Sequence, residues 1–273
     1  MELRSKTAII TGSGSGIGRA LALGFARQGA NVVCCARREA EIERTVELIR
    51  QEGGHGLAIA TDVTLKDQVD SIVRKAIAAF GQIDVLFNNA GSFQTIGGLW
   101  EVDADAWWHD VAVNLRGPML CCQAVLPHMM ERDDGIIINM NGGGSTVPLP
   151  GGSGYGCSKA GLIRLTDTLA RELERVGSQV LVFGMGPGLV RTEMTELQTN
   201  TEKGREWIPS TAECFESGRT RNPDDCAKST IELIRVACPE LSGRNFGAGA
   251  DFDDILKRKD EIQKDDLYVM RSR

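Results

Sequence analysis

Short apolar runs alternate with longer amphipathic stretches from the first residues of the chain to about residue 247. Short apolar runs bounded by turn residues are typical of buried strands, and apolar positions that recur at helical spacing are typical of helices packed on one face. Their alternation predicts an α/β Rossmann fold in which a doubly wound, parallel, seven-stranded sheet carries helices on both faces. The expected strands are residues 7–10, 31–35, 56–60, 85–88, 135–139, 179–183 and 244–247.

Helical periodicity fills the gaps between these strands. Asp103 or Asp105 is suited to cap a helix that continues through His109. The other expected helices are residues 17–28, 39–51, 65–80 and 154–175.

No internal repeat or low-complexity linker interrupts this pattern, so we expect a single domain over residues 1–273. Residues 195–221 are polar, follow a strand end and precede Pro223, which suits either a substrate lid or a surface insertion. Residues 251–273 form a charged tail whose apolar side chains could dock on the body of the protein or on another subunit. These side chains are Leu256, Ile262, Leu267 and Tyr268.

Composition restricts the class of partner. The 273 residues are 42% hydrophobic and 25% charged and include 32 glycines, as in a globular protein rich in turns. With 31 basic against 37 acidic residues, and no stripe of Lys or Arg, we expect no nucleic-acid partner. The N-terminus lacks an apolar signal core, and no apolar stretch approaches the roughly 20 residues that span a bilayer. We therefore expect no membrane partner and a cytoplasmic location.

The cysteines and histidines do not suggest a metal site. Eight cysteines include the adjacent pairs Cys34–Cys35 and Cys121–Cys122, which stand in apolar segments and lack C-x-x-C spacing. We expect reduced cysteines in the core. The three histidines are widely separated in sequence, which argues against a zinc-dependent dehydrogenase.

Residues 11–18 read Thr-Gly-Ser-Gly-Ser-Gly-Ile-Gly and stand between the first expected strand and the first expected helix. Glycines in this context let the main chain approach a pyrophosphate at a helix N-terminus. The spacing is T-G-x-x-x-G-I-G, and taken alone it could also be only a tight strand-to-helix turn. The expected cofactor-binding residues of this loop are Gly12, Ser13, Gly14, Ser15, Gly16, Ile17 and Gly18.

Tyr155 and Lys159 lie one helical turn apart in Tyr-Gly-Cys-Ser-Lys. Because residues four apart share a helix face, the Lys159 ammonium can lie near the Tyr155 hydroxyl and favour its ionised form. At roughly 4 Å and an effective dielectric of about 20, this attraction is about 4 kcal/mol. It would lower a phenol pKa near 10 by roughly three units. We therefore expect a general acid/base that works near neutral pH.

With these motifs the chain resembles the short-chain dehydrogenase/reductase family from residue 6 to about residue 249. Three further motifs match in the same order: Asn-Asn-Ala-Gly at 88–91, Asn114 in Val-Asn-Leu-Arg-Gly, and Pro-Gly-Leu-Val-Arg-Thr at 187–192. The resemblance implies a single-domain Rossmann fold that binds a nicotinamide cofactor. It also implies homodimers or homotetramers built through the helices at 103–126 and 154–175.

The resemblance implies roles for the matching residues. Tyr155 resembles the proton donor or acceptor, Lys159 the group that lowers its pKa and holds the nicotinamide ribose, and Asn114 the residue that positions a relay water. Asn88 and Asn89 could instead mainly cap main-chain groups at the strand end. Further cofactor contacts are implied for Asp62 and Val63 beside adenine, for Asn89, Ala90 and Gly91 along the cofactor, for Val190 and Thr192 at the carboxamide, and for Pro187 and Gly188 in the same motif.

Cofactor preference depends on the end of the second strand. An acidic residue there binds the ribose 2′-hydroxyl, whereas a small residue followed by Arg accommodates a 2′-phosphate. This chain has Ala36 at that position, followed by Arg37 and Arg38. We therefore expect NADP(H) to be preferred. NAD(H) is the alternative, because Ser15 stands where many NADP-binding relatives carry a basic residue and the two arginines could be a solvated helix start.

One family position departs from the pattern. The family has a serine thirteen residues before its tyrosine, whose hydroxyl orients the substrate carbonyl; here that position is Gly142. The neighbouring Asn141 can donate a hydrogen bond through its amide, so we expect it to replace the serine as a fourth catalytic residue beside Tyr155, Lys159 and Asn114. Ser145 and, less favoured, Ser153 are alternatives, and a site without this donor is another.

Three functions remain open from the sequence. The first is an oxidoreductase that transfers a hydride between NADP(H) and a secondary alcohol or ketone, with Tyr155 exchanging the proton. The second is a cofactor-binding protein with little or no turnover, which only the missing serine supports. The third is an epimerase or lyase that retains its cofactor.

Overall fold

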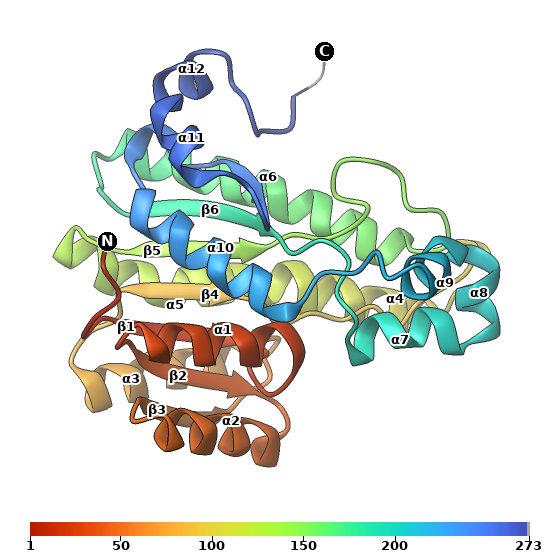
Figure 1. Ribbon diagram of the computed structural model, residues 1–273, viewed down its shortest axis with the longest axis horizontal. Helices are drawn as coiled ribbons and strands as arrows, with labels where there is room; N and C mark the ends of the chain where they lie inside the picture. The colour runs from red at the N-terminus through yellow and green to blue at the C-terminus, as the bar shows by residue number, and fades with distance from the viewer. Residues whose placement is uncertain (272–273) are drawn as a thin grey trace.

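Seven parallel strands form one sheet in the computed structural model, which describes residues 1–271. Their spatial order is β3-β2-β1-β4-β5-β6-β7, with helices on both faces of the sheet (Figure 1). The prediction of a doubly wound Rossmann fold is confirmed. The strands are β1 (Thr7–Thr11), β2 (Asn31–Ala36), β3 (His55–Ala60), β4 (Val85–Asn88), β5 (Ile136–Met140), β6 (Leu181–Gly186) and β7 (Asn245–Gly247).

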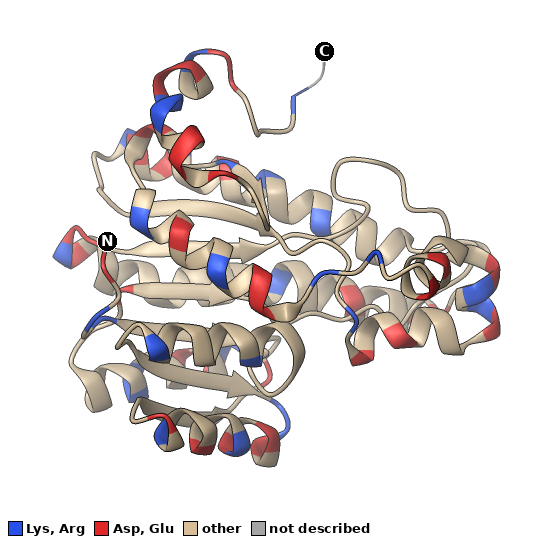
Figure 2. Cartoon of the chain, viewed as in Figure 1, with Lys and Arg blue, Asp and Glu red and all other residues tan. Residues whose placement is uncertain are grey.

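The strands contain no Asp, Glu, Lys or Arg, and in Figure 2 the charges lie on the helices and loops around them. Helices cover both sides of a parallel sheet, so its strands are apolar throughout and do not alternate. That uniform apolar character explains why the predicted strands were found within a few residues of their observed bounds. The largest shift is at β6, expected at 179–183 and observed at Leu181–Gly186.

One face of the sheet is covered by α1 (Gly16–Arg27), α2 (Glu39–Gln51), α10 (Pro223–Val236) and α11 (Phe252–Lys257) (Figure 1). The opposite face is covered by α3 (Lys66–Phe80), α5 (Gly117–Arg132) and α6 (Ser153–Arg175). Each face has its own apolar core, because neighbouring residues on a strand point to opposite sides. Cys34 lies in one core and Cys35 in the other, and these two, Cys121 and Cys122 are buried and free.

Asp84 ties the start of β4 to its neighbours. Its fully buried carboxylate accepts a hydrogen bond from the Thr7 main-chain N–H at 2.8 Å and pairs with Lys6 at 3.1 Å and Arg132 at 2.8 Å. A buried carboxylate without such partners would be costly. These contacts stabilise the amino ends of the strands, at the edge of the sheet opposite the carboxyl ends.

Three short helices follow β6 and extend to one side of the sheet: α7 (Glu193–Asn200), α8 (Glu202–Trp207) and α9 (Pro209–Glu216) (Figure 1). They occupy the segment expected to be a lid. Lys203 of α8 pairs with Glu101 at 2.6 Å, and Trp207 packs edge-on against Trp100 with ring centroids 5.9 Å apart. The segment is thereby joined to the turn that precedes α4 (Ala104–Val111).

The C-terminal residues cover the edge strand β7. After α11 and α12 (Lys259–Lys264), the Tyr268 carbonyl accepts a hydrogen bond from the Asn245 N–H at 2.9 Å, and the Tyr268 ring packs on Phe246. Ile262 is fully buried, whereas Leu256 is exposed. The last two residues of the expected tail, 272–273, lie outside the described residues.

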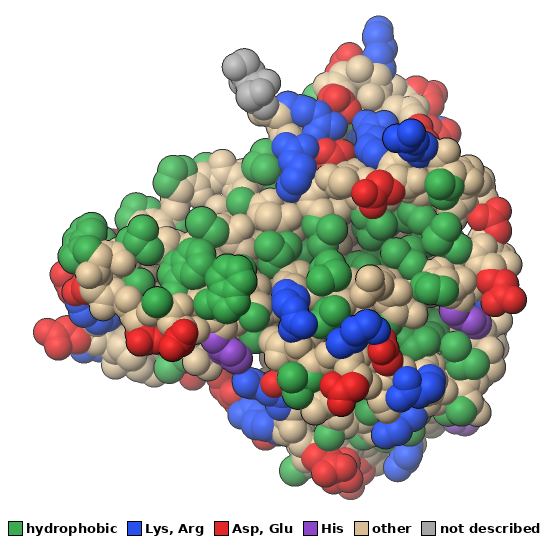
Figure 3. Space-filling view, turned by 180° about the vertical axis from the view of Figure 1, so that it is seen from behind, with side chains coloured by type: hydrophobic (Ala, Val, Ile, Leu, Met, Phe, Trp, Pro, Cys, Tyr) green, Lys and Arg blue, Asp and Glu red, His purple; other side chains and the backbone are tan. Residues whose placement is uncertain are grey.

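The face formed by α4, α5 and α6 carries apolar side chains at its surface (Figure 3). They include Trp108, Met119 and Met130. Asp103 caps α4 by accepting a hydrogen bond from the Ala106 N–H at 2.8 Å, as one of the two expected caps. Assembly through these helices remains a prediction.

Candidate active site

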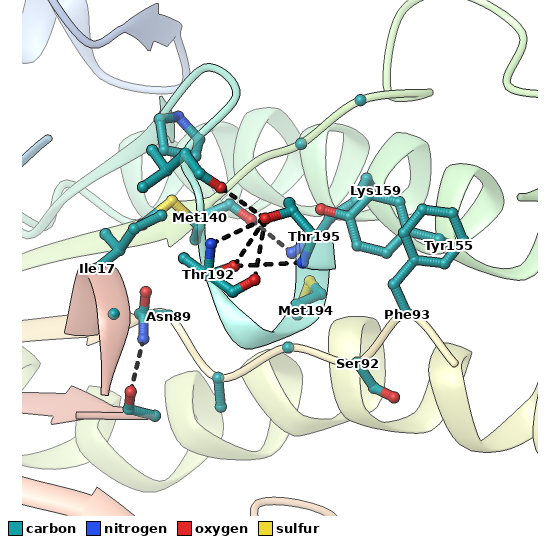
Figure 4. A pocket seen from close by; sticks show the side chains of 18 of the residues that line it. Ile17, Asn89, Ser92, Phe93, Met140, Tyr155, Lys159, Thr192, Met194 and Thr195 are labelled. Carbon is teal, nitrogen blue, oxygen red and sulfur yellow. Dashed lines mark hydrogen bonds between the residues drawn. The ribbon is translucent and has the colours of Figure 1, made fainter. Parts of the chain in front are cut away.

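A cavity of about 1210 Å³ opens at the carboxyl ends of the strands, where β1 and β4 lie side by side. Chain connections leave the sheet in opposite directions at this point, which makes it the usual binding crevice of a doubly wound sheet. The residues expected at the site line this cavity except for Ser13 and Asn114. Figure 4 shows part of the wall, with Phe93, Tyr155 and Lys159 on one side and Ile17 and Asn89 on the other.

The glycine loop is packed so closely that side chains would not fit. A Cβ on Gly12, where φ is 67°, would lie 2.8 Å from the Ala90 Cα, and one on Gly18 would lie 2.1 Å from the Gly12 carbonyl oxygen. Ser15, the N-cap of α1, makes no side-chain capping hydrogen bond. The N–H groups that begin α1 therefore face the cavity without a side-chain acceptor, as an anion site requires.

Ser13, an expected cofactor contact, does not line the cavity. It is fully buried, and its hydroxyl accepts a hydrogen bond from the Cys35 N–H at 2.9 Å. Its carbonyl accepts one from Thr45 at 2.9 Å. Ser13 thus holds the glycine loop against β2 and α2, a role that depends on contacts distant in sequence.

Asn88 and Asn89 act mainly on the protein itself. The Asn89 amide donates to the carbonyls of Thr11 at 2.8 Å and Gly12 at 3.1 Å, which fixes the glycine loop to the end of β4. The Asn88 amide donates to Asn139 Oδ1 at 2.9 Å. The alternative that these residues satisfy main-chain and neighbouring polar groups therefore describes most of their contacts, although Asn89 also lines the cavity.

The two arginines after β2 differ in their surroundings. Both line the cavity and are exposed, but Arg38 pairs with Glu193 of α7 at 3.0 Å, across the cavity mouth. Among residues 1–271, no side chain or carbonyl accepts a hydrogen bond from Arg37. Arg37 is therefore the guanidinium that stays available to an anion at the end of β2.

Tyr155 and Lys159 project from the first turns of α6 into the cavity. The Tyr155 ring is stacked on Phe93, with centroids 4.5 Å apart and an interplanar angle of 13° (Figure 4). Lys159 Nζ donates to the Met140 carbonyl at 2.8 Å and lies 5.5 Å from the Tyr155 ring centroid. The helical spacing therefore brings the pair together as expected.

The expected lowering of the Tyr155 pKa is wrong. Burial, with a smaller effect of the Asp110 carboxylate, raises the pKa of Tyr155 to about 12. Burial also lowers the pKa of Lys159 to about 8. Spacing along a helix indicates the attraction between the two groups but not the cost of removing both from water, and here that cost dominates.

Asn114 stands in a π-helical segment (Ala112–Arg116) between α4 and α5. Its side chain is fully buried: Oδ1 accepts from the Ser92 N–H at 2.8 Å and Nδ2 donates to the Ser92 carbonyl at 2.7 Å. Single π-turns inside helices are common at functional sites because they displace main-chain groups from the regular ladder. The side chain holds the loop after β4, and its relay role remains a prediction.

Asp110 is a site residue that the sequence reasoning missed. Its fully buried carboxylate accepts hydrogen bonds from the Ser92 hydroxyl and from the N–H groups of Gln94 and Thr95. These contacts fix the loop that carries Phe93 against the Tyr155 ring. The available signal was its position four residues before Asn114, on the same helix face.

Asn141, which was expected to replace the family serine, lines the cavity, but its amide is held by another side chain. Asn141 Nδ2 donates to Asn245 Oδ1 at 2.7 Å, in a pair that lies over Gly184 of β6, where a Cβ would come within 1.9 Å of Asn245 Oδ1. Successive side chains along β5 point to opposite sides of the sheet, and Asn141 continues this alternation. Its side chain therefore points to the side opposite to that of position 142. Asn245, like Asp110, is a residue that the sequence reasoning did not identify as part of the site.

The two serines that were alternatives to Asn141 differ in their position relative to the cavity. Ser145 lines the cavity. The Ser153 hydroxyl instead accepts a hydrogen bond from Trp107 Nε1 at 3.0 Å and is not among the lining residues. Ser153 is therefore not positioned to act on a ligand in the cavity.

Within residues 1–271, no three His, Cys, Asp or Glu side chains come together as metal ligands. None of the helices described there is both long enough and apolar enough to cross a membrane.

Comparison with known proteins agrees with this geometry. The short chain dehydrogenase family matches residues 6–203. A short chain dehydrogenase of Pseudocercospora fijiensis is 36% identical, covering 98% of this chain and 90% of its own length. The 3-oxoacyl-[acyl-carrier-protein] reductase of Thermotoga maritima is 32% identical, with 90% of this chain and 97% of that protein covered.

Two solved structures have the same fold. A variant of the actinorhodin polyketide ketoreductase with NADPH superposes with a TM-score of 0.81 at 28% identity, covering 89% of this chain and 95% of that one. A metagenomic short-chain oxidoreductase in complex with NADP gives a TM-score of 0.71 at 29% identity, covering 88% and 94%. With its glycine loop, its Tyr155–Lys159 pair and these relatives, the chain belongs to the short-chain dehydrogenase/reductase family and is an NAD(P)-dependent oxidoreductase.

Proposed function

We propose that the protein transfers a hydride between NADP(H) and a secondary alcohol or ketone, with Tyr155 exchanging the proton. The observation that carries the proposal is the placement of Tyr155 and Lys159 together in the cavity that also contains the glycine loop. A phenol and an ammonium at the far end of a nucleotide crevice supply the acid and the positive charge that carbonyl reduction needs.

The residues present fit a nicotinamide dinucleotide. The uncapped start of α1 would hold the pyrophosphate, Asp62 and Val63 would lie beside adenine, and Lys159 would bind the nicotinamide ribose. When bound, the reduced cofactor supplies the hydride. Arg37 favours NADP(H), because no carboxylate follows β2 at Ala36 and its guanidinium has no partner among residues 1–271.

Tyr155 is the acid in the reductive direction. Because burial raises its pKa to about 12, the phenol is protonated near pH 7 and can donate its proton to the carbonyl oxygen as the carbonyl carbon accepts the hydride. The phenolate left behind is stabilised by the Lys159 cation, which the Met140 carbonyl holds beside it. The C=O double bond becomes CH–OH, and the phenolate is then reprotonated from solvent.

The substrate end of the cavity is uncharged. The charged lining residues other than Lys159 are Arg37, Arg38, Glu41 and Asp62, after β2 and β3, and Glu193, which pairs with Arg38. Near Tyr155 and the lid segment the lining is apolar or neutral: Phe93, Gln94, Ser145, Thr146, Leu149, Met194, Leu197, Gln198, Ile208, Ser210, Thr211 and Cys214. No fixed charge there would bind a carboxylate beside the carbonyl, so we propose an uncharged ketone with apolar substituents.

The test is NADPH oxidation, followed by absorbance, with a panel of uncharged alkyl and aryl ketones and size-matched 2-keto acids. Uncharged ketones should be reduced and the acids should not. Tyr155→Phe keeps the ring that stacks on Phe93 but lacks the proton, so it should lose about 10²-fold to 10⁴-fold in kcat/KM without losing NADPH affinity. An equal rate for the phenylalanine variant would refute the role of Tyr155.

The absence of a serine at Gly142 gives the cofactor-binding alternative its one support. NADPH fluorescence separates the two functions. Binding that changes NADPH fluorescence, without oxidation by any ketone or reduction by any alcohol of the panel, would favour a binding protein.

A further inference from the structure

Gly142, which occupies the family's serine position, lies directly against the catalytic hydroxyl. A Cβ on Gly142 would be 2.2 Å from the Tyr155 hydroxyl oxygen and 2.9 Å from the ring carbon that carries it. Real Cβ contacts essentially never come this close. The space for any side chain at this position, serine included, is therefore taken by Tyr155.

Tyr155 has little freedom to make room. Its ring is half-buried and stacked on Phe93, which is itself only 4% exposed. The loop that carries Phe93 is fixed by the buried carboxylate of Asp110, which accepts hydrogen bonds from Gln94 and Thr95. Position 142 thus presents main chain, and not a side chain of its own, to the reacting hydroxyl.

The segment after Gly142 is a turn that leaves main-chain N–H groups available to a ligand. Gly143 and Gly144 form the turn, and Gly144 has a φ of 77° whereas Gly143 does not have a positive φ. A positive φ at the second central residue fits a type II turn. Among residues 1–271, no acceptor is found for the main-chain N–H groups of residues 142–145, that of Gly143 included.

The turn is anchored on one side and open on the other. A Cβ on Gly144 would lie 2.8 Å from the Gly156 Cα, so Gly144 packs tightly against α6. Gly143 lines the cavity, and a Cβ there would meet nothing within 4 Å. Just before the turn in the chain, the Asn141 amide donates a hydrogen bond to Asn245, which holds the end of β5 in place.

We propose that the main-chain N–H of Gly143 donates a hydrogen bond to the substrate carbonyl oxygen and so takes the place of the family's serine hydroxyl. The inference rests on the proposed reductase function. The N–H transfers no proton. It stabilises the negative charge that develops on the oxygen as the hydride and the Tyr155 proton are transferred. Main-chain N–H groups that do not move during the reaction serve this purpose well.

Gly143→Pro tests the donor with little change to the fold. Proline lacks an N–H, and it is favoured at the first central position of a type II turn. Gly143→Ala is the matched control, since it retains the N–H and its methyl group would enter open space. The proline variant should lose on the order of 10²-fold or more in kcat/KM, the usual effect of removing one such donor. The alanine variant should stay close to wild type, and both should bind NADPH normally by fluorescence titration.

Gly142→Ser separates the proposal from a site that simply lacks a donor. Restoring the family serine should lower kcat/KM, because its Cβ would displace the Tyr155 hydroxyl. An increase in rate would overturn the proposal, as would a proline variant at position 143 that works at wild-type rate. A loss as large in Gly143→Ala as in Gly143→Pro would also overturn it.

Ser145→Ala completes the set. Its loss in kcat/KM should stay well below that of Gly143→Pro, and a large loss in this variant together with an active Gly143→Pro would assign the donor to Ser145. Wild-type protein that reduces none of the ketones would refute the proposed function itself, whereas active wild-type protein with an insensitive Gly143 refutes only the donor.

Discussion

Replacing Asn141 by alanine distinguishes a structural side chain from a catalytic one. In the structure its amide is buried, with 5% of the residue exposed, and Nδ2 donates to Asn245 Oδ1 at 2.7 Å. The pair joins the end of β5 to β7 across Gly184. If this is the function of Asn141, its removal should reduce stability and leave most of the catalysis intact.

The expected magnitude follows from what remains buried. Asn141→Ala deprives Asn245 Oδ1 of the only donor found for it among residues 1–271, and an unsatisfied buried polar group costs about 1–3 kcal/mol. Asn245→Ala should cost a similar amount, because it leaves the Asn141 amide unpaired. Asn141 Oδ1 and Asn245 Nδ2 already lack partners among residues 1–271, so the double variant removes these groups as well. Its loss should fall short of the sum of the single losses by about 1 kcal/mol or more.

The assay combines stability with activity. Urea unfolding at one fixed protein concentration gives the free energy of unfolding of the wild type, both single variants and the double variant. Steady-state kinetics with the best ketone should show a fall in kcat/KM of less than about tenfold for Asn141→Ala, or 1.4 kcal/mol of transition-state stabilisation. A variant with unchanged stability and NADPH affinity that loses a hundredfold or more in kcat/KM would refute this reasoning and place the Asn141 amide on the substrate.

Three further predictions concern charge. Because burial lowers the pKa of Lys159 to about 8, NADPH affinity and kcat/KM should fall as the pH rises through that value, and Lys159→Arg should make the affinity independent of pH there. Arg37→Ala should weaken NADPH binding by about tenfold or more and leave NADH binding unchanged, because hydrogen bonds between charged groups contribute about 1.5–3 kcal/mol. Arg38→Ala should have the smaller effect on NADPH binding, since Arg38 is already paired with Glu193. Burial alone would raise the pKa of Asp84, but hydrogen bonds from one N–H and two cations outweigh burial and lower the pKa. This carboxylate therefore stabilises the fold above its unfolded pKa near 4, and the stabilisation is lost as the pH falls through the folded pKa. Asp84→Asn should lose about 3 kcal/mol near neutral pH and show a flatter decline in acid by urea unfolding; an unchanged curve would contradict the role of the carboxylate.

The sequence by itself determined the sheet and the place of the cavity. Strands covered on both faces must be apolar throughout, so β1 (Thr7–Thr11) and β4 (Val85–Asn88) are recognisable from a few residues. The glycine loop is recognisable for a similar reason, because a side chain on Gly12 or Gly18 would meet main chain at 2.8 Å or less. Tyr155 and Lys159 share a helix face by spacing alone.

Only the tertiary structure decided the direction of the Tyr155 pKa shift and the hydrogen-bond partner of Asn141. The pKa of Tyr155 depends on the burial of its phenol, which stacks on Phe93, and on the charge of a carboxylate at position 110, and both neighbours come from other elements of the fold. The acceptor of the Asn141 amide lies 104 residues away in the sequence, on a strand separated from it by β6. Local patterns report the chemistry that a side chain carries, but its surroundings come from distant segments, and these set both its pKa and the atom to which it donates.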